Sequence, residues 1–429
     1  MLGGGTFEAM DKKLPGTYIN FISLPQVESR NYDRGIAAIG MSFDWGPEDL
    51  SKVNSTDLLT ESKKLFGYDY TDDAMLPVRE IFKHARTVYF YRLNGGGVKA
   101  SATGFTATCS GTRGNKLSVK IEASVDITGA YIVKTLLDGE VVDKQTVTAA
   151  SGLVDNDFVK FSASSITLTA GTTALTGGTN GTVTGEKHSA FLAALENKSF
   201  HVLGCNSSES SVKAVYVAYT ERMRDERGLK FQTVIFNGTA DYEGVINMDS
   251  NAGVTIDVLP WVTGAEAGCS LSDSLTNYEY DGELELAPEY TQAQLEDALD
   301  AGKFVFHIVG EDSVRVLQDV NSLVSYTVKK SKVFALNDVI RTIDMLATQE
   351  AAIFNERYIG LKNTADNRGA LWSDIVKIHN DLQDMQALEN FTSDDITIAQ
   401  GVDKGDVVVT SVITVTSAMI KLYITTYIG

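Results

Sequence analysis

The stretch that most restricts the fold of this chain is VVVTSVITVTSAMIKLYITTYI, from Val407 to Ile428, which contains one charged residue, Lys421. About 20 consecutive apolar residues can cross a bilayer as a helix. Here Ser and Thr residues interrupt the run, and most of its residues are β-branched rather than Leu or Ala. From Met419 onward, apolar side chains alternate with others, which is typical of a half-buried strand. The sequence therefore predicts a terminal strand, with no hairpin partner beside it, rather than a membrane span.

Composition narrows the class of protein. The chain has 429 residues, 43% of them hydrophobic, which is enough for two to four domains with separate cores. Its 37 basic and 56 acidic residues give a formal net charge of -19. This charge opposes contact with nucleic-acid phosphates and with anionic membranes. We therefore expect neither a nucleic-acid function nor membrane insertion.

The cysteines and the amino terminus indicate where the protein resides. Cys109, Cys205 and Cys269 are odd in number and far apart, so they form neither a disulfide framework nor a metal knuckle. The first residues, MLGGGTFEAMDKK, lack the apolar core of a secretory signal. Both features favour a reducing compartment, and we expect the protein to stay where it is synthesised.

The first 96 residues have a mixed α/β pattern, and a change follows the break Asn94 to Gly97. Before the break we expect strands at Pro15–Pro25, Gly35–Phe43 and Thr87–Leu93, and helices at about Asp57–Phe66 and Asp73–His84. After it, up to about Thr184, no helical period is present and Thr, Ser, Gly and Val dominate. Short runs separated by turn signals predict an inserted antiparallel β sandwich or small barrel, closed by the loop Thr176 to Gly181.

Strands and helices alternate in the next section. We expect strands at Ser199–Cys205, Leu229–Asn237 and Val254–Val262, a helix at Ser211–Arg227, and a helix from the capping box of Thr291 and Gln294 to near Gly302. This alternation predicts an open, largely parallel sheet covered by helices. From Val333 a helical period runs to a stop at Gly360, and a second helix is expected at about Trp372–Leu388. The strand ITIA and the turn Asp403 to Asp406 precede the apolar end.

No motif in the sequence indicates catalysis. The nucleophile elbow, the phosphate loop and the paired-histidine metal motif are all missing. The histidines are scattered, and His201 and His307 fit structural roles better than that of a base, although a triad assembled in space stays open. The acid pairs Asp72–Asp73 and Asp394–Asp395 suit helix starts better than a cation site. The stretch Gly177 to Gly185 lacks the preceding strand and following acid of a dinucleotide site and is expected to be a hairpin. We therefore predict no catalytic, cofactor-binding or metal-binding residues.

The strand-like segments at the two ends are unusual because charge and proline barely protect their edges. Two interpretations remain: the segments pair with each other inside one molecule, or each extends the sheet of a neighbouring copy. A ten-residue arm spans ~33 Å. Burying about five apolar side chains gives on the order of 10 kcal/mol, whereas ordering ten residues costs on the order of 10 to 20 kcal/mol. A repeating assembly, in which every subunit gives and receives arms, gains through effective concentration. Donated arms therefore indicate a polymer.

Seven segments carry a resemblance: PGTYINF, FDWGPE, LFGYDY, TVYFYRLNGG, GTRGN, IFNERYIGLKN and AMIKLYITTYI. In this order they resemble contractile tail sheath proteins, which form the outer sleeve of contractile bacteriophage tails and of phage-tail-like bacteriocins. The resemblance covers nearly the whole chain, and the order of the segments is more specific than any one of them.

The resemblance implies a multidomain α/β and α+β fold. Its parts are an inner mixed α/β domain from both chain ends, an inserted antiparallel β domain, and a subtilisin-like α/β domain without a catalytic site. The implied divisions are 1–96 and 331–429, each with a donated strand arm, 97–184 for the β domain and 185–330 for the subtilisin-like domain. By match of position, the resemblance implies that Tyr18, Ile19 and Phe21 at one end, and Ile420, Leu422, Tyr423 and Ile424 at the other, belong to the donated arms. Lys377 and Lys404 are expected near the inner tube.

The implied function is mechanical. Subunits would form a helical homopolymer around a tail tube, bounded by baseplate and tail terminator proteins, and contract to drive the tube through a bacterial envelope without any cofactor. The protein would belong to a virion tail or bacteriocin particle assembled in the host bacterial cytoplasm. Two other classes remain as alternatives: a different self-assembling surface protein and a subtilisin-like hydrolase.

Overall fold

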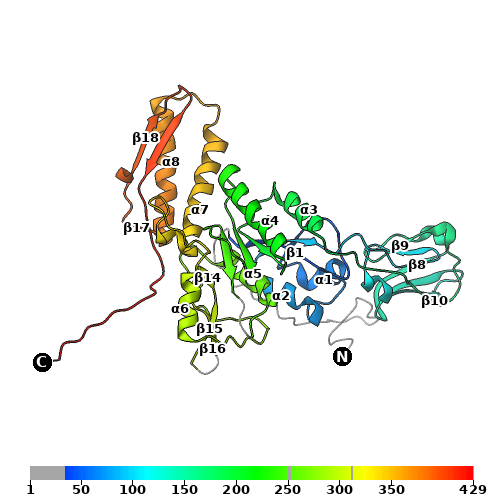
Figure 1. Ribbon diagram of the computed structural model, residues 1–429. Helices are drawn as coiled ribbons and strands as arrows, with labels where there is room; N and C mark the ends of the chain where they lie inside the picture. Colours follow the sequence, from blue (N-terminus) through cyan, green and yellow to red (C-terminus); the bar gives the residue numbers. More distant parts are fainter. Residues whose placement is uncertain (1–33, 250–252, 311–312, 429) are drawn as a thin grey trace, which may run out of the picture.

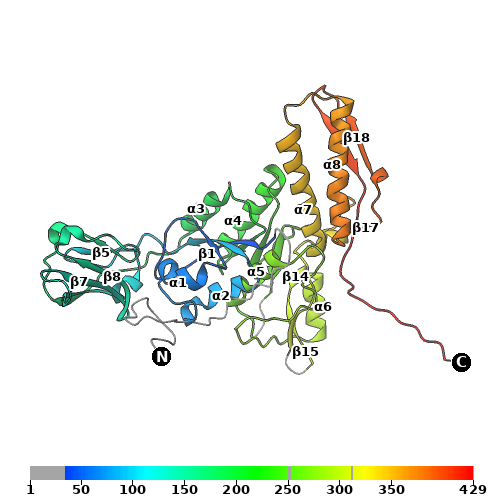
Figure 2. The same ribbon diagram turned by 180° about the vertical axis from the view of Figure 1, so that it is seen from behind.

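The structure is a computed structural model that describes residues 34–249, 253–310 and 313–428. A central α/β body carries an all-β section on one side and a long helical hairpin on the other (Figures 1 and 2). The last residues of the chain leave the base of the hairpin and run away from the body. No helix in the described ranges is long and apolar enough to span a membrane.

The central body is built on a seven-stranded sheet with the order β14-β13-β12-β11-β1-β3-β2. Its strands are β1 (Ile36–Met41), β2 (Ser51–Asn54), β3 (Thr87–Arg92), β11 (Val202–Cys205), β12 (Gln232–Phe236), β13 (Val245–Met248) and β14 (Lys303–Phe304). All neighbours are parallel except β2, which pairs antiparallel with β3 at the edge. The predicted parallel sheet is confirmed. However, the chain before the β section and the chain after it share this one sheet, although the sequence pattern predicts that they belong to separate parts.

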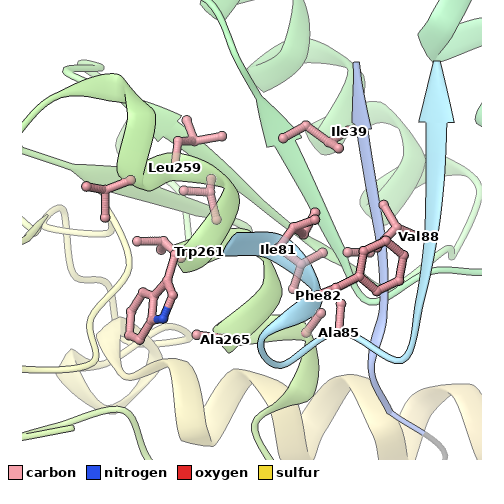
Figure 3. Close-up of a cluster of buried hydrophobic side chains, with 14 of the residues drawn as sticks. Ile39, Ile81, Phe82, Ala85, Val88, Leu259, Trp261 and Ala265 are labelled. Carbon is pink, nitrogen blue, oxygen red and sulfur yellow. The ribbon is translucent and has the colours of Figure 1, made fainter. Parts of the chain in front are cut away.

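Helices cover both faces of this sheet, because alternate strand residues point to opposite sides. These helices are α1 (Leu58–Phe66), α2 (Leu76–Phe82), α3 (Gly185–Leu195), α4 (Ser210–Glu221) and α5 (Leu259–Gly268). Ile39 packs in the core formed with α1, α2 and α5, and its neighbour Ala38 packs in the core formed with α3 and α4. Figure 3 shows the first core, in which Ile81 and Phe82 of α2 lie between the strands and Trp261 of α5.

One expected strand, Val254–Val262, is wrong. The residues form a short 3-10 turn, Ile256–Val258, and then the start of α5. Residues Leu259 to Ala267 are all buried, so the segment shows no polar face from which a helical period could be recognised. Pro260 occupies the first turn of the helix, where a missing backbone donor is tolerated. Short strands β2 and β13 were also not predicted.

The β section lies between β3 and α3 and has its own core. One sheet has the order β10-β6-β7-β8 and the other the order β4-β5-β9, with antiparallel pairing throughout, as predicted. The strands are β4 (Ser101–Ala102), β5 (Phe105–Ala107), β6 (Leu117–Ala123), β7 (Tyr131–Leu137), β8 (Glu140–Val147), β9 (Val159–Phe161) and β10 (Gly171–Ala174). Trp45, from the loop after β1, completes this core and stacks on Phe158 with ring centroids 6.1 Å apart.

Two segments that lie side by side connect the β section to the central body, and we call this pair the neck (residues 94–98 and 178–184). Gly181 donates its N–H to Asn94 O at 2.9 Å, and Thr179 donates to Val98 O at 3.0 Å. A Cβ on Gly97 would lie 1.9 Å from Thr179 O, so only glycine allows this approach. The hairpin expected in this glycine-rich stretch is therefore wrong, because the segment pairs with the outgoing chain and leads into α3.

The helical hairpin consists of α7 (Asn337–Ile353), which continues as a π turn (Phe354–Tyr358), and α8 (Ala365–Asp384). Gly360 ends the first helix with a φ of 89°, as predicted. The second helix begins earlier than expected, since the Thr364 side chain accepts the Asn367 N–H and caps a polar first turn. The strands β17 (Leu388–Glu389), β18 (Ile396–Gln400), β19 (Val407–Ser411) and β20 (Thr414–Val415) form two small antiparallel sheets beside these helices. Elsewhere, α6 (Gln292–Asp300) has the predicted capping box, and β15 (Phe306–Val309) pairs with β16 (Ser313–Val316).

A buried ionic cluster fastens α7 to the central body. Arg341 on α7 donates to Glu266 Oε2 at 2.7 Å and to Asp319 Oδ2 at 2.8 Å. Asn337 Nδ2 donates to Asp319 Oδ1 at 2.7 Å, and all four side chains are inaccessible to solvent. Burial, reinforced by the charge of Asp319, raises the pKa of Glu266 well above its usual value. Burial also acts to raise the pKa of Asp319, but Arg341 and the hydrogen bonds lower it overall.

Candidate intermolecular interface

The carboxy-terminal arm, defined here as residues 419–428, is the most exposed apolar segment of the described chain. It extends away from the rest of the molecule in both views (Figures 1 and 2). The exposed fractions of Leu422, Tyr423 and Ile424 are 83%, 86% and 75%, and that of Ile420 is 39%. No residue of the arm pairs with a strand in the described part of the chain. The strand expected from Met419 is therefore absent here, because a strand exists only when a ladder partner is present.

One interpretation of the terminal segments is that they pair inside one molecule. Within the described residues, the carboxy-terminal arm pairs with no other strand. The amino-terminal residues assigned an arm role, Tyr18, Ile19 and Phe21, lie outside the described residues. Their assignment stays a prediction.

The root of the arm is held firmly, in contrast to the arm itself. Thr416 donates its N–H to Ala387 O at 3.1 Å and its hydroxyl to Gln386 O at 2.5 Å. Ser417 Oγ and the Ala418 N–H both donate to Asp338 Oδ2, at 2.9 and 3.1 Å. Beyond Ala418 the arm has no hydrogen bond to any other part of the described chain. The arm therefore leaves the molecule from a fixed point.

Along α8, between the arm's root and the tip of the helical hairpin, the two-stranded sheet of β18 and β19 presents open strand edges. The two strands pair from Ile396↔Ser411 to Gln400↔Val407, and neither has a second β neighbour among the described residues. β18 packs on α8 through Ile396, which shares a core with Ile375. Val409 pairs opposite Ile398, so both side chains lie on the same face, yet Val409 is 37% exposed. Part of the inner face of β19 is therefore uncovered.

The two lysines expected near the tube both lie on the surface of the helical hairpin region. Lys377 is exposed on α8, and Lys404 is exposed on the turn between β18 and β19. The carbonyl oxygen of Lys404 accepts from Asn363 Nδ2 at 3.0 Å, which ties this turn to the loop between the helices. Neither lysine forms an ion pair within the described ranges. Both are accessible to a partner, and their contact with a tube stays a prediction.

His201, weighed above as a possible base, has a structural role in this fold. His201 Nδ1 accepts the Ile36 N–H at 3.2 Å, and burial together with Arg34 lowers its pKa to about 3. Burial also lowers the pKa of His307 on β15. Burial raises the pKa of the Cys205 and Cys269 thiols to about 12, which leaves them protonated.

The acid pairs confirm the preferred interpretation. Asp72 precedes the 3-10 turn at Asp73–Met75, and Asp395 forms a capping box with Thr392. The described part of the chain contains no group of three or more His, Cys, Asp or Glu residues placed to hold a metal ion.

Two features of this interface were missed from the sequence. Asp338 fits the helical period that begins at Val333, and nothing local in the sequence indicates that it binds Ala418, 80 positions away. The open edge of β19 was also missed. Its run of three valines, Val407 to Val409, was read as part of the apolar end rather than as a separate strand.

Comparisons with known proteins show that successive parts of the chain are similar to the domains of one protein family. Successive parts of the chain match four family descriptions: the N-terminal region of domain III of the tail sheath protein Gp18 at 34–93, and the phage tail sheath protein beta-sandwich, central and C-terminal domains at 95–180, 181–322 and 329–429.

Individual relatives are similar over almost the full length. The phage-like element PBSX protein XkdK of Bacillus subtilis (strain 168) is 33% identical, over 98% of this chain and 99% of that protein. The crystal structure of a sheath tail protein from Desulfitobacterium hafniense is 34% identical, with a TM-score of 0.78, over 94% of this chain and 100% of that chain. The PVC sheath complex of an extracellular contractile injection system, in its contracted state, shares the fold at 10% identity, with a TM-score of 0.53 over 98% of both chains.

Proposed function

This chain belongs to the phage tail sheath family, and from that premise we propose that it polymerises around an inner tube and contracts to drive the tube through a bacterial envelope. The observation that carries the proposal is that one molecule has both an unpaired strand-like arm and an open sheet edge that could receive such an arm. An exposed apolar arm without a partner and a two-stranded sheet with open edges both belong to the described carboxy-terminal part of the chain. Strand addition satisfies both, because main-chain hydrogen bonds extend the receiving sheet and apolar side chains cover its uncovered face.

The proposed mechanism depends on a difference between the folded body of the molecule, which many internal contacts hold together, and the arm, which beyond its root has no hydrogen bond to the rest of the described chain. The ionic cluster at Arg341 and the hydrogen bonds of the neck hold each molecule as one body, whereas the arm is anchored only at its root. Subunits linked by arms can therefore rotate as rigid bodies while the arms act as hinges. We propose that the extended lattice has the higher free energy, is held at a baseplate, and releases that energy when new contacts form between outer surfaces. No nucleotide takes part.

The remaining assignments rest on the family. Proposed partners are a tail tube protein, contacted through the region of Lys377 and Lys404, together with baseplate and tail terminator proteins. The particle is a virion tail or a phage-tail-like bacteriocin, assembled in the host cytoplasm. We also propose that the parallel sheet and its helices have a subtilisin-like fold without a catalytic site, with domain divisions near residues 96, 184 and 330. The helical hairpin and the amino-terminal arm would together form the inner layer.

Removal of the arm tests the proposal. Deleting residues 419–429 leaves Ser417 and Ala418 bound to Asp338, so we expect a folded protein with an unchanged melting temperature. The truncated protein should remain monomeric by mass photometry, whereas the full chain forms striated sleeves or stacked rings in negative stain. Ile424→Asp should behave like the truncation. Val328→Asp is the matched control, because Val328 is also exposed but lies outside the arm. Sleeves formed by the truncated protein would contradict the proposal.

A further inference from the structure

A second apolar feature lies at the far tip of the helical hairpin, where α7, α8 and the turn between β18 and β19 meet. It is a cavity of about 220 Å³, and we call it the tip pocket. Its lining includes Phe354, Ile359, Leu361, Leu371 and Val407. Three of these are substantially exposed, with exposed fractions of 37% for Phe354, 63% for Ile359 and 55% for Leu361. Large apolar side chains gathered around a hollow are typical of a binding surface rather than of scattered surface residues.

The polar part of the tip holds this pocket in shape. Asn363 Nδ2 donates to Lys404 O at 3.0 Å and to Asp406 O at 2.8 Å, which joins the helical loop to the strand turn. Asn367 Nδ2 donates to Lys362 O at 2.7 Å, and Arg368 Nη1 donates to Asn363 Oδ1 at 2.7 Å. The walls are therefore fixed by hydrogen bonds while the apolar floor is left open. A site prepared in this way loses little conformational entropy when it is filled.

A backbone irregularity forms one wall. The last turn of α7, from Phe354 to Tyr358, is a π turn, and such turns occur often at functional sites. Tyr358 OH donates to Asp374 Oδ2 at 2.8 Å, which keeps the Tyr358 ring against α8. The π turn thus places Phe354 at the surface, on the side of the pocket.

The position of the pocket identifies its occupant. Val407 lines the pocket and is the first residue of β19, whose outer edge is open in the described chain. A strand added to that edge passes the pocket at Val407. The arm of a second copy has the side chains for it, since Ile420, Leu422, Ile424 and Ile428 alternate with polar or aromatic residues and share one face. An apolar cavity of ~150 Å³ holds a benzene molecule, so 220 Å³ has room for two branched aliphatic side chains.

From this continuity we infer that the tip pocket is a socket for the carboxy-terminal arm of a second copy of this chain, filled by Leu422 and Ile424. The inference rests on the proposed strand donation and adds a defined anchor to it. Main-chain hydrogen bonds alone do not fix the register of an added strand, because the ladder repeats along the chain. Two side chains in a fixed socket set that register, while Lys362 and Arg368 form a polar rim around the apolar centre.

Cross-linking between two variants tests the contact. One protein carries Ile359→Cys and the other Ile424→Cys, both in a Cys109→Ser background, because Cys109 is partly exposed and the other two thiols are buried. Any short bis-maleimide link between the two variants must then join different copies. We expect a linked dimer when the mixture assembles and none when Val328→Cys replaces Ile359→Cys. Assembly of the mixture without any link between positions 359 and 424 would overturn the inference.

A charge in the socket gives an independent measurement. Ile359→Asp changes an exposed residue, so the monomer should keep its melting temperature. We expect the concentration needed for assembly to rise about tenfold or more, the effect of losing one buried anchor. Normal assembly of Ile359→Asp, with no link to any arm position, would overturn the socket but leave strand donation standing. Absence of assembly by the unmodified chain would overturn both.

Discussion

The backbone N–H of Ala418 donates to Asp338 Oδ2 at 3.1 Å, and the hydroxyl of the preceding Ser417 donates to the same oxygen at 2.9 Å. A carboxylate in the first turn of α7 therefore binds the last two residues of the arm's root, beside the two hydrogen bonds of Thr416. Its other oxygen accepts the Val339 N–H at 2.8 Å, so its position is fixed by the helix. The direction in which the arm leaves is consequently set by α7 rather than by the arm.

Asp338→Ala should free the arm root. We expect the exchange of the Ala418 amide hydrogen to accelerate about tenfold or more, since loss of one hydrogen bond to a charged group is worth on the order of 1.5 to 3 kcal/mol. Hydrogen exchange with mass spectrometry measures this on the peptide that contains residues 416–421. Asp338→Asn is the control, because it retains one acceptor oxygen and should have a smaller effect. Unchanged protection in Asp338→Ala would show that Thr416 alone secures the root.

Arg341→Ala should destabilise the whole molecule. The substitution leaves Glu266 and Asp319 buried without their cation, and breaking a buried pair in this way costs about 3 to 5 kcal/mol. Arg315→Ala removes an exposed ion pair with Glu279 and should cost no more than about 1 kcal/mol. Urea unfolding followed by circular dichroism compares the two. Equal losses would mean that the buried cluster does not hold α7 to the central body.

His201 should make folding stability sensitive to acid. Its folded pKa, lowered to about 3, is well below the usual value near 6.5, so the folded state resists protonation. The stability contributed by neutral His201 is therefore complete above pH 6.5 and is lost as the pH falls toward 3. We expect His201→Gln to flatten the decrease in unfolding free energy between pH 7 and pH 5. His307→Gln, at a less buried histidine, should change that slope less.

Trp45→Ala should loosen the β section selectively. Trp45 is 1% exposed, stacks on Phe158 and donates its indole N–H to Lys64 O at 3.1 Å. Truncating a buried aromatic residue costs about 3 to 5 kcal/mol. We expect faster amide exchange in β6 and β7 than in β1 and β11, measured by hydrogen exchange. Trp45→Phe keeps a stacked ring, so its amide exchange in β6 and β7 should be faster than in the unmodified protein and slower than in Trp45→Ala. Uniform acceleration in both sheets would show that the sections unfold together.

Patterns of period two and of helical period predicted most elements of the fold. α1, α4 and α7 were recognised because each has one buried and one exposed side. β1 and β3 were recognised as short apolar runs bounded by turn residues, and α6 by the capping box at Thr291. α5 was mistaken for a strand because it is buried on every side. The sharing of one sheet by β3 and β11 was not predicted either, since about a hundred residues of β section separate them.

The candidate interface was likewise predicted only in part. The sequence identified Leu422, Tyr423 and Ile424 as apolar residues without a partner, and the structure leaves them exposed. It did not identify the receiving groups. The tip pocket joins residues 354–371 to residues 405–407, and the arm root joins Ala418 to Asp338. Such contacts depend on tertiary packing and have no signature in local sequence.

The backbones of the neck's two segments approach closely at Gly97 and Thr179 and at Gly181 and Gly95, and Trp45 extends from the central body into the core of the β section. The β section is thus joined to the central body by two paired segments and a shared core. In the proposed sheath, a push on the outer strands, β6 to β8, would pass through these contacts to β1 and β3.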